Sequence, residues 1–279
     1  MRGHALQRNG PGHAKRAAAS HSGRQGDCRQ MSQIGQRVLV VGGSSGMGEA
    51  GVRALAACGA RVVMADRKKA PDDLGAERVL EIDVGDDTRI SSVVSEAGEI
   101  LGGLDAVWNN AGVCHVGTLE SMELDAFELS FALNVRANAL LARAALPLLR
   151  QAGGGSLLFT ASAASIMVAK GSLPYIVSKS ALLTMTRQLA LEYAGDNIRV
   201  NALCPGWVDT PFNAPAWEMF GGRESFLQKV PELVPLHRMG TVEEFGAIVR
   251  FILSADARFM TGQAVVVDGG ESLIKGPTR

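Results

Sequence analysis

The residues with the clearest chemical use are Tyr175 and Lys179, four positions apart in a segment that we expect to be helical. Side chains at that spacing lie on one face of a helix. A phenol with its ordinary pKa of about 10 is a poor base at neutral pH, but a neighbouring ammonium favours the phenolate and lowers that pKa. The pair can therefore take a proton from an alcohol or give one to a carbonyl. Taken alone, this spacing is most often an ordinary pair on a helix surface.

The hydroxyl that could complete this pair belongs to Ser162, thirteen residues before Tyr175. Ser162 follows closely on an apolar segment, residues 156–160, that we predict to be a strand. Parallel sheets bind their ligands at the carboxyl ends of the strands, so a side chain at this position can reach a substrate. Ser165, in the same run of small residues, is the alternative, and the spacing favours Ser162.

A glycine-rich loop, VGGSSGMG, occupies residues 41–48 between a predicted strand and a predicted helix. Gly42, Gly46 and Gly48 permit positive φ and let the backbone approach a pyrophosphate. At the start of the following helix, free N–H groups and the helix dipole favour an anion. An ordinary strand-to-helix turn is the alternative. Because the flanking elements are those of a nucleotide site, we predict that this loop binds a dinucleotide.

An acidic residue, Asp66, ends the next predicted strand, 24 positions after Gly42. A carboxylate at this place accepts hydrogen bonds from the adenosine ribose hydroxyls and repels a 2′-phosphate. Arg67 could pair with that phosphate, although it also begins a run of three basic residues that water can solvate. Position 45 is Ser rather than a basic residue, which removes one common phosphate partner. We therefore predict NAD rather than NADP as the cofactor.

The elements that must position these residues alternate between short apolar strands and helices. We predict strands at residues 37–41, 61–65, 79–82, 106–108, 156–160, 198–202 and 264–267, and helices at 47–58, 88–101, 127–150, 175–194 and 242–254. Apolar strands between helices are typical of a parallel sheet covered on both faces. Since no linker rich in Pro, Gly and Ser interrupts residues 35–273, we predict one α/β domain of the doubly wound Rossmann type over residues 34–279.

Residues 1–33 have a different composition, rich in Gly, Arg, Ala, His and Ser, and lack helical or strand periodicity. We expect a disordered leader, because the segment has no apolar face to bury. The alternatives are an upstream-extended start before Met31, an expression tag, and a transit segment that bears Arg but almost no acid.

The composition excludes several classes of function. Hydrophobic residues at 47% and charged residues at 20% are typical of a globular protein. Six of the 28 basic residues but one of the 28 acidic residues lie in residues 1–30, so the remaining chain carries a net charge of −5, which argues against a nucleic-acid surface. The four cysteines are scattered, so we expect no metal site and a reducing, cytoplasmic location. Polar residues interrupt the longest apolar stretch, residues 131–149, so we expect no membrane span.

From about residue 36 to residue 270 the chain resembles the short-chain dehydrogenase/reductase family. The shared motifs occur in order and at the family spacing: the T-G-x-x-x-G-x-G loop with Val41 in place of Thr, Asp83-Val84, Asn109-Asn110-Ala111-Gly112, Tyr175-x-x-x-Lys179, Pro205-Gly206 and Asp268-Gly269-Gly270. In the family the Thr hydroxyl ties the loop to the Asn-Asn-Ala-Gly turn. Its replacement by Val41 puts the rigidity of the loop in question.

The resemblance implies a role for each candidate residue. Ser162 would hold the substrate oxygen, and Tyr175 would transfer its proton. Lys179 would lower the pKa of Tyr175 and bind the nicotinamide ribose. Asn134, which by itself would be an ordinary buried polar residue, would hold a water near Lys179. The implied cofactor contacts are Gly42, Ser44, Ser45, Gly46, Met47, Gly48, Asp66, Arg67, Asp83, Val84, Asn110, Ala111, Gly112, Tyr175, Lys179, Pro205, Gly206, Val208 and Thr210.

In the family, the segment after Pro205-Gly206 usually closes the substrate pocket. Here, the predicted lid spans about residues 207–236, and its first twenty residues contain six large apolar side chains: Trp207, Phe212, Trp217, Met219, Phe220 and Phe226. These side chains could form a lid over an apolar or ring-bearing secondary alcohol. A pair of helices packed on the core, or a contact between subunits, would equally explain them.

We therefore expect an oxidoreductase that transfers a hydride between NAD(H) and an apolar or ring-bearing secondary alcohol or ketone. One alternative is an NADPH-dependent carbonyl reductase of the 3-oxoacyl type, and the other is a nucleotide-binding regulator without catalysis. In the family, the helices that correspond to residues 127–150 and 175–194 form a contact between subunits, so a homotetramer or homodimer is implied.

Overall fold

The computed structural model describes residues 35–274, so the predicted leader, residues 1–33, lies outside the described residues. Its centre is a sheet of seven parallel strands in the order β3-β2-β1-β4-β5-β6-β7. The strands are β1 (Arg37–Val41), β2 (Arg61–Asp66), β3 (Arg78–Glu81), β4 (Ala106–Asn109), β5 (Gly155–Thr160), β6 (Ile198–Pro205) and β7 (Ala264–Val267). Because β1 lies between β2 and β4, the strand order reverses there, and a ligand crevice opens at such a point of a parallel sheet.

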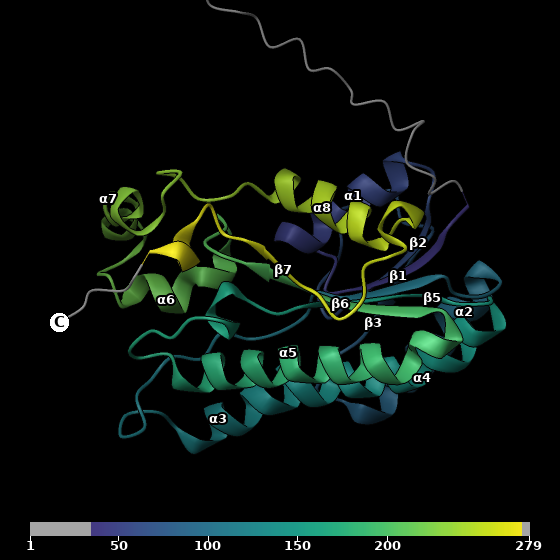
Figure 1. Cartoon of the computed structure of the whole chain (residues 1–279), viewed down its shortest axis with the longest axis horizontal. Coiled ribbons are helices and arrows are strands. Elements are labelled where there is room, and N and C mark those ends of the chain that lie inside the picture. The colour runs from purple at the N-terminus through teal and green to yellow at the C-terminus, as the bar shows by residue number, and fades with distance from the viewer. Residues whose placement is uncertain (1–34, 275–279) are drawn as a thin grey trace, which may run out of the picture.

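Helices cover both faces of the sheet (Figure 1). On one face lie α1 (Gly46–Ala57) and α8 (Val242–Leu253), and on the other lie α2 (Asp87–Leu101), α3 (Leu124–Phe131), α4 (Ala137–Gln151) and α5 (Leu173–Tyr193). Two further helices, α6 (Ala214–Glu218) and α7 (Arg223–Leu233), lie together toward one end of the molecule. This arrangement confirms the predicted doubly wound Rossmann fold. Within residues 35–274, no helix is both long and apolar enough to cross a membrane.

The strands are apolar on both sides because each side faces a hydrophobic core. In β1, Leu39 and Val41 join the core that includes residues of α2, α4 and α5, whereas Val38 and Val40 join the core that includes residues of α1 and α8. All four side chains are fully buried. Burial of one such aliphatic side chain contributes about 1.5–3 kcal/mol, so this short segment gains more as a central strand than in any exposed conformation.

Two predicted elements differ by three residues at one end from those observed, and the other predicted bounds agree to within two residues. The strand predicted to end at residue 202 continues to Pro205, because its pairing with β7 extends to Val267. The helix predicted over residues 127–150 begins at Leu124 and contains a π-helical turn, Ala132–Arg136, between α3 and α4.

The π-helical turn has a local cause in two asparagines. The backbone N–H of Ala137 donates to the carbonyl oxygen of Ala132, five residues earlier. The carbonyl oxygen of Asn134 accepts a hydrogen bond of 2.9 Å from the side chain of Asn138. These bonds widen the helix by one residue at Asn134, and such turns occur frequently at functional sites.

Candidate active site

A cavity of about 490 Å³ lies at the carboxyl ends of the strands, within the size range of ligand sites. Its walls come from the segments that follow β1 to β6 and from the first turns of α1 and α5. Every residue that we predicted to contact cofactor or substrate lines this cavity, with the exceptions of Gly48 and Asn134. The fold therefore brings together residues that are up to 168 positions apart in the sequence, from Gly42 to Thr210.

The glycine-rich loop passes close to the Asn-Asn-Ala-Gly turn. Gly42 has a φ of 80°, and a Cβ on it would lie 2.6 Å from the backbone nitrogen of Ala111. A Cβ on Gly48 would clash with the carbonyl oxygen of Gly42, so Gly48 lies behind the loop and lets it fold back tightly. Only glycine fits at these two positions.

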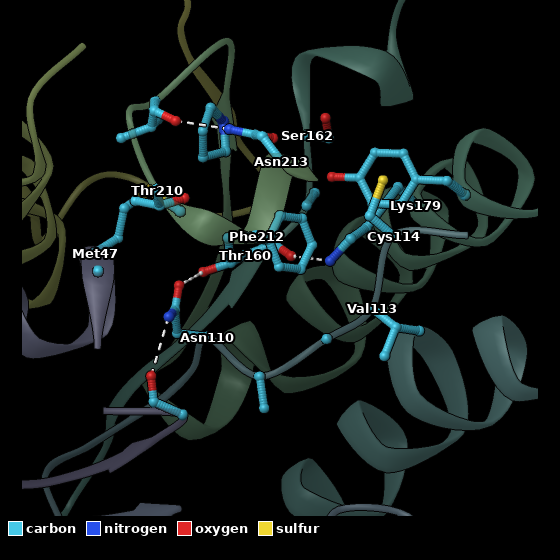
Figure 2. A pocket seen from close by; sticks show the side chains of 18 of the residues that line it. Met47, Asn110, Val113, Cys114, Thr160, Ser162, Lys179, Thr210, Phe212 and Asn213 are labelled. Atoms are coloured by element: carbon cyan, nitrogen blue, oxygen red, sulfur yellow. Dashed lines mark hydrogen bonds between the residues drawn. The ribbon is translucent and has the colours of Figure 1, made fainter. Parts of the chain in front are cut away.

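Asn110 ties the loop to this turn. Its side-chain nitrogen donates to the carbonyl oxygen of Gly42 at 3.1 Å, and its backbone N–H donates to Val41 at 2.8 Å. The side-chain oxygen of Asn110 in turn accepts a hydrogen bond of 3.1 Å from the hydroxyl of Thr160, as Figure 2 shows. The two bonds from Asn110 connect the loop to the turn without a hydroxyl at position 41.

The beginning of α1 fits an anion. Its N-cap is Ser45, which makes no side-chain hydrogen bond to the first turn, so that turn has N–H groups available to a ligand. Ser45, Gly46 and Met47 all line the cavity. This arrangement and the close backbone of the loop fit a bound pyrophosphate.

Asp66, at the end of β2, is held by backbone and hydroxyl donors. One carboxylate oxygen accepts from the backbone N–H of Ser44 at 3.0 Å and from its hydroxyl at 2.7 Å. The other oxygen accepts from the backbone N–H of Lys68 at 3.0 Å. Arg67 and Lys68 line the same part of the cavity and are exposed. A fixed carboxylate therefore lies beside two cations at this wall.

Tyr175 and Lys179 lie on the first two turns of α5 and both line the cavity. The Lys179 ammonium lies 5.9 Å from the centre of the Tyr175 ring and donates a hydrogen bond of 2.7 Å to the carbonyl oxygen of Thr160. Burial lowers the pKa of Lys179 to about 8. Figure 2 shows Lys179 between Thr160 and Cys114.

Ser162, and not Ser165, contributes its side chain to the cavity wall. Burial raises the pKa of Tyr175 above its ordinary value, and a hydrogen bond with Ser162 opposes that rise. The Ser162 oxygen also accepts from the backbone N–H of Ala164 at 3.1 Å, while the Ser165 hydroxyl accepts from the backbone N–H of Ser162 at 3.2 Å. Ser165 therefore supports the turn that presents Ser162.

Asn134 lies behind the cavity and is fully buried. Its side-chain oxygen accepts from the backbone N–H of Val113 at 2.9 Å, and its nitrogen donates to the carbonyl oxygen of Val113 and to the hydroxyl of Ser178, each at 3.0 Å. These bonds join the turn at residues 109–113 to α5. A Cβ on Gly112 would lie 2.7 Å from the Asn134 side-chain oxygen and 3.2 Å from the Lys179 nitrogen. The π-helical turn thus positions Asn134 directly beside this backbone, and its role as a water ligand stays a prediction.

The remaining predicted cofactor residues lie at opposite sides of the cavity. Asp83 and Val84 follow β3, and the Asp83 carboxylate accepts from the backbone N–H of Gly85 at 2.8 Å. On the other side, the segment after β6 supplies Pro205, Gly206, Val208 and Thr210. The Thr210 methyl group lies 3.2 Å from the position that a Cβ on Gly46 would take, so this segment contacts the glycine-rich loop and closes the cavity there.

The predicted lid has two parts. Trp207 and Phe212 line the cavity, and the Phe212 ring lies 6.2 Å from that of Tyr175. Trp217 and Phe226 instead lie in a buried cluster with neighbours from α7, and the Trp207 ring packs on this cluster with its centre 4.4 Å from that of Phe226. Some of the aromatic residues thus pack between helices, and a lid over a substrate stays a prediction.

Sequence reasoning missed several residues of the wall, among them Cys114, Met167, Asn213 and Glu271. Cys114 follows directly on the Asn-Asn-Ala-Gly motif and its valine, and Glu271 follows directly on Asp-Gly-Gly, so proximity to a motif was an available signal. Burial raises the pKa of the Cys114 thiol to about 11, despite the opposing effect of Lys179. Among the described residues, no three His, Cys, Asp or Glu side chains are grouped as metal ligands would be.

Known proteins resemble this chain over most of its length. A family model described as enoyl-(acyl carrier protein) reductase matches residues 41–272. The dehydrogenase/reductase SDR family member 4 of Oryctolagus cuniculus is 37% identical over 242 residues, which are 83% of this chain and 92% of that protein. The oxidoreductase UcpA of Salmonella typhimurium is 32% identical over 250 residues, 86% of this chain and 95% of that protein.

Solved structures agree in fold as well as sequence. Levodione reductase superposes with a TM-score of 0.81 at 29% identity, and covers 87% of this chain and 99% of its own. The aldohexose dehydrogenase of Thermoplasma acidophilum gives a TM-score of 0.80 at 27% identity, over 89% of this chain and 98% of its own. The sheet order, the motifs at the cavity and the relatives that match over most of their length together show the family. The chain belongs to the short-chain dehydrogenase/reductase family, whose members are oxidoreductases that use nicotinamide cofactors.

Proposed function

We propose that this oxidoreductase transfers a hydride between NAD(H) and an apolar or ring-bearing secondary alcohol or ketone. The observation that carries the proposal is the position of Ser162, Tyr175 and Lys179 on the wall of a cavity that also contains the glycine-rich loop and Asp66. A general acid/base and a nucleotide site thus share one space. Membership of the family supports the hydride transfer itself.

The nicotinamide cofactor accepts or supplies the hydride. The first-turn N–H groups of α1 would bind its pyrophosphate, and Asp66 would bind the adenosine ribose. By resemblance, Asp83 and Val84 would contact the adenine, and Asn110, Ala111 and Gly112 would lie under the ribose. Val208 and Thr210 would bind the carboxamide. The close packing at Gly42 and Gly48 supports this assignment, because any side chain there would displace the loop that a pyrophosphate must approach.

The proton moves at Tyr175. For alcohol oxidation the phenolate oxygen takes the hydroxyl proton of the substrate, and for carbonyl reduction the phenol returns it. Burial alone opposes the phenolate, so the charge of Lys179 and the hydrogen bond from Ser162 must favour it. The hydrogen bond from Lys179 to Thr160 keeps the ammonium in place for this purpose. Ser162 would also orient the substrate oxygen.

Asp66 supports NAD as the preferred cofactor, because its carboxylate would repel a 2′-phosphate. The exposed cations Arg67 and Lys68 beside it favour the second candidate, an NADPH-dependent carbonyl reductase. We propose NAD because both oxygens of Asp66 are held in place by donors of Ser44 and Lys68, which fixes the negative charge at this wall. A homodimer or homotetramer and a cytoplasmic location stay predictions.

Replacement of Tyr175 by Phe tests the proposal. The wild type is screened with cyclic and aromatic secondary alcohols, with NAD and with NADP, at the nicotinamide absorbance. Tyr175→Phe should lower turnover by about 100-fold or more, since it removes the general acid/base, while NADH binding measured by fluorescence is kept. Tyr193→Phe, at the only other tyrosine of the chain, is the matched control and should keep full activity. Near-normal rates in Tyr175→Phe would contradict the assignment.

A further inference from the structure

The cavity contains a carboxyl group that the proposed chemistry does not use. Glu271 begins a short 3₁₀ turn, Glu271–Leu273, directly after Asp268-Gly269-Gly270, and lines the same cavity as Tyr175. One of its carboxylate oxygens, Oε1, accepts a hydrogen bond of 2.9 Å from the indole nitrogen of Trp207. Within residues 35–274, the other oxygen, Oε2, has no hydrogen-bond donor.

The turn that carries Glu271 is held by its own hydrogen bonds. The Asp268 carboxylate accepts from the backbone N–H of Gly270 at 2.9 Å and from that of Ser272 at 2.8 Å. Gly270 has a φ of 90°, a conformation that turns the chain back toward the cavity. Glu271 is therefore positioned by a defined backbone turn and by Trp207.

Glu271 borders the segment after β6, which carries proposed cofactor contacts and two aromatic residues of the cavity wall. Its Oε2 atom is 3.0 Å from the position that a Cβ on Gly206 would take, so it borders the segment 205–212 that follows β6. The same segment supplies Trp207 and Phe212, and Phe212 is adjacent to Tyr175. Of the two aromatic residues in this segment, Phe212 lies beside the proton-transfer group Tyr175, and Trp207 binds the carboxyl group of Glu271.

A carboxyl group in this setting favours a ligand that donates a hydrogen bond. Burial raises the pKa of Glu271 to about 7, although the bond from Trp207 opposes the rise. The Oε2 atom has no donor from the described part of the protein, so a substrate hydroxyl that enters the cavity can donate to it in place of water. A hydroxyl suits this carboxyl group better than an ammonium, because a hydroxyl can donate to the carboxylate or accept from the protonated acid, whereas an ammonium can only donate.

We infer that Glu271 determines specificity by accepting a hydrogen bond from a second hydroxyl group of the substrate. The preferred substrates would then be ring-bearing diols, in which one hydroxyl reacts at Tyr175 and the other binds Glu271. This inference rests on the proposed function, and adds to it a requirement for a second polar group on an otherwise apolar ring.

Paired substrates test the inference directly. The values of kcat/KM are measured for cyclohexanol and for the cis and trans forms of cyclohexane-1,2-, 1,3- and 1,4-diol, with NAD and with NADP. The wild type should prefer at least one diol over cyclohexanol by about 10-fold or more, as expected for one hydrogen bond to a charged group. In Glu271→Leu this ratio should fall to about one. In Glu271→Gln the ratio should lie between those of the wild type and Glu271→Leu, because an amide oxygen still accepts a hydrogen bond.

Control variants separate recognition from folding. Glu218→Gln changes an exposed carboxylate of α6 and should keep the wild-type ratio. Trp207→Phe removes the indole N–H but keeps an aromatic ring, so the ratio should fall through a higher KM for the diol. A thermal unfolding measurement shows which variants are folded. If Glu271→Leu does not fold, the diol preference of Trp207→Phe tests the inference in its place.

Three outcomes would overturn the inference. A wild type that oxidises cyclohexanol but prefers none of the diols would refute it and leave the proposed function intact. A folded Glu271→Leu with an undiminished diol preference would do the same. A wild type that oxidises none of these alcohols with either cofactor would instead count against the proposed function, and the inference would fall with it.

Discussion

Replacing Lys179 by Met should raise the pKa of Tyr175 and move alcohol oxidation to higher pH. The ammonium lies 5.9 Å from the centre of the Tyr175 ring. At an effective dielectric constant of about 20, two unit charges at this distance interact by about 3 kcal/mol. That energy corresponds to about 2 pKa units. The fraction of phenolate at neutral pH should therefore fall by about 100-fold in the variant, and kcat for oxidation with it.

The pH dependence distinguishes this electrostatic effect from a simple loss of binding. Because burial lowers the pKa of Lys179 to about 8, the ammonium is present below that pH and is lost above it. The ratio of wild-type to Lys179→Met activity should therefore be largest below pH 8 and should narrow as the pH rises. The assay is kcat for oxidation of a secondary alcohol from pH 6 to pH 10, with cofactor saturating at every pH.

A conservative variant serves as the control for this prediction. Lys179→Arg keeps the positive charge and should keep more activity at neutral pH than Lys179→Met, with a profile closer to that of the wild type. A loss in Lys179→Met of the same factor at every pH would refute the electrostatic reasoning. It would mean that Lys179 acts through cofactor binding alone.

Three further predictions concern the cofactor site and the sheet. Asp66→Ser removes the charge that opposes a 2′-phosphate, so the ratio of NADP to NAD kcat/KM should rise by about 10-fold or more, and a wild type that already prefers NADP would contradict this. Gly48→Ala places a methyl group against the carbonyl oxygen of Gly42, so the Kd for NADH should rise by at least about 10-fold, measured by fluorescence titration. Asp105→Asn breaks the 2.7 Å ion pair with Arg37 and should lower the free energy of unfolding at pH 7 by about 1–3 kcal/mol in a denaturant titration. Burial opposes ionisation of Asp105, but hydrogen bonds from Arg37 hold its pKa below the ordinary value of an Asp. The difference in unfolding free energy between wild type and Asp105→Asn should therefore be fully present at a pH above that ordinary pKa. It should disappear as the pH falls through the lower pKa of the folded state.

The sequence by itself determined the features that depend on neighbours along the chain. Successive side chains of a strand point to opposite faces of the sheet, and both faces of a central parallel strand are buried, so its residues are apolar throughout. The strand β1, Arg37–Val41, could therefore be predicted without a structure. The helical period placed Tyr175 and Lys179 on one face, and the strand-turn-helix context identified the loop at residues 41–48. These relations act over a few residues, and a single sequence displays them directly.

Tertiary structure decided which side chains meet across the sheet. Ser162 and Ser165 are three residues apart and chemically alike, and only the turn between them shows that Ser162 lines the cavity. Asn110 connects the glycine-rich loop to its own turn through a hydrogen bond to Gly42, 68 positions away in sequence. Glu271 joins the cavity 96 positions after Tyr175. Hydrophobic periodicity indicates whether a residue is buried but not which distant segment it contacts. These contacts therefore form only when β1, β4, β5, β6 and β7 lie side by side in the sheet.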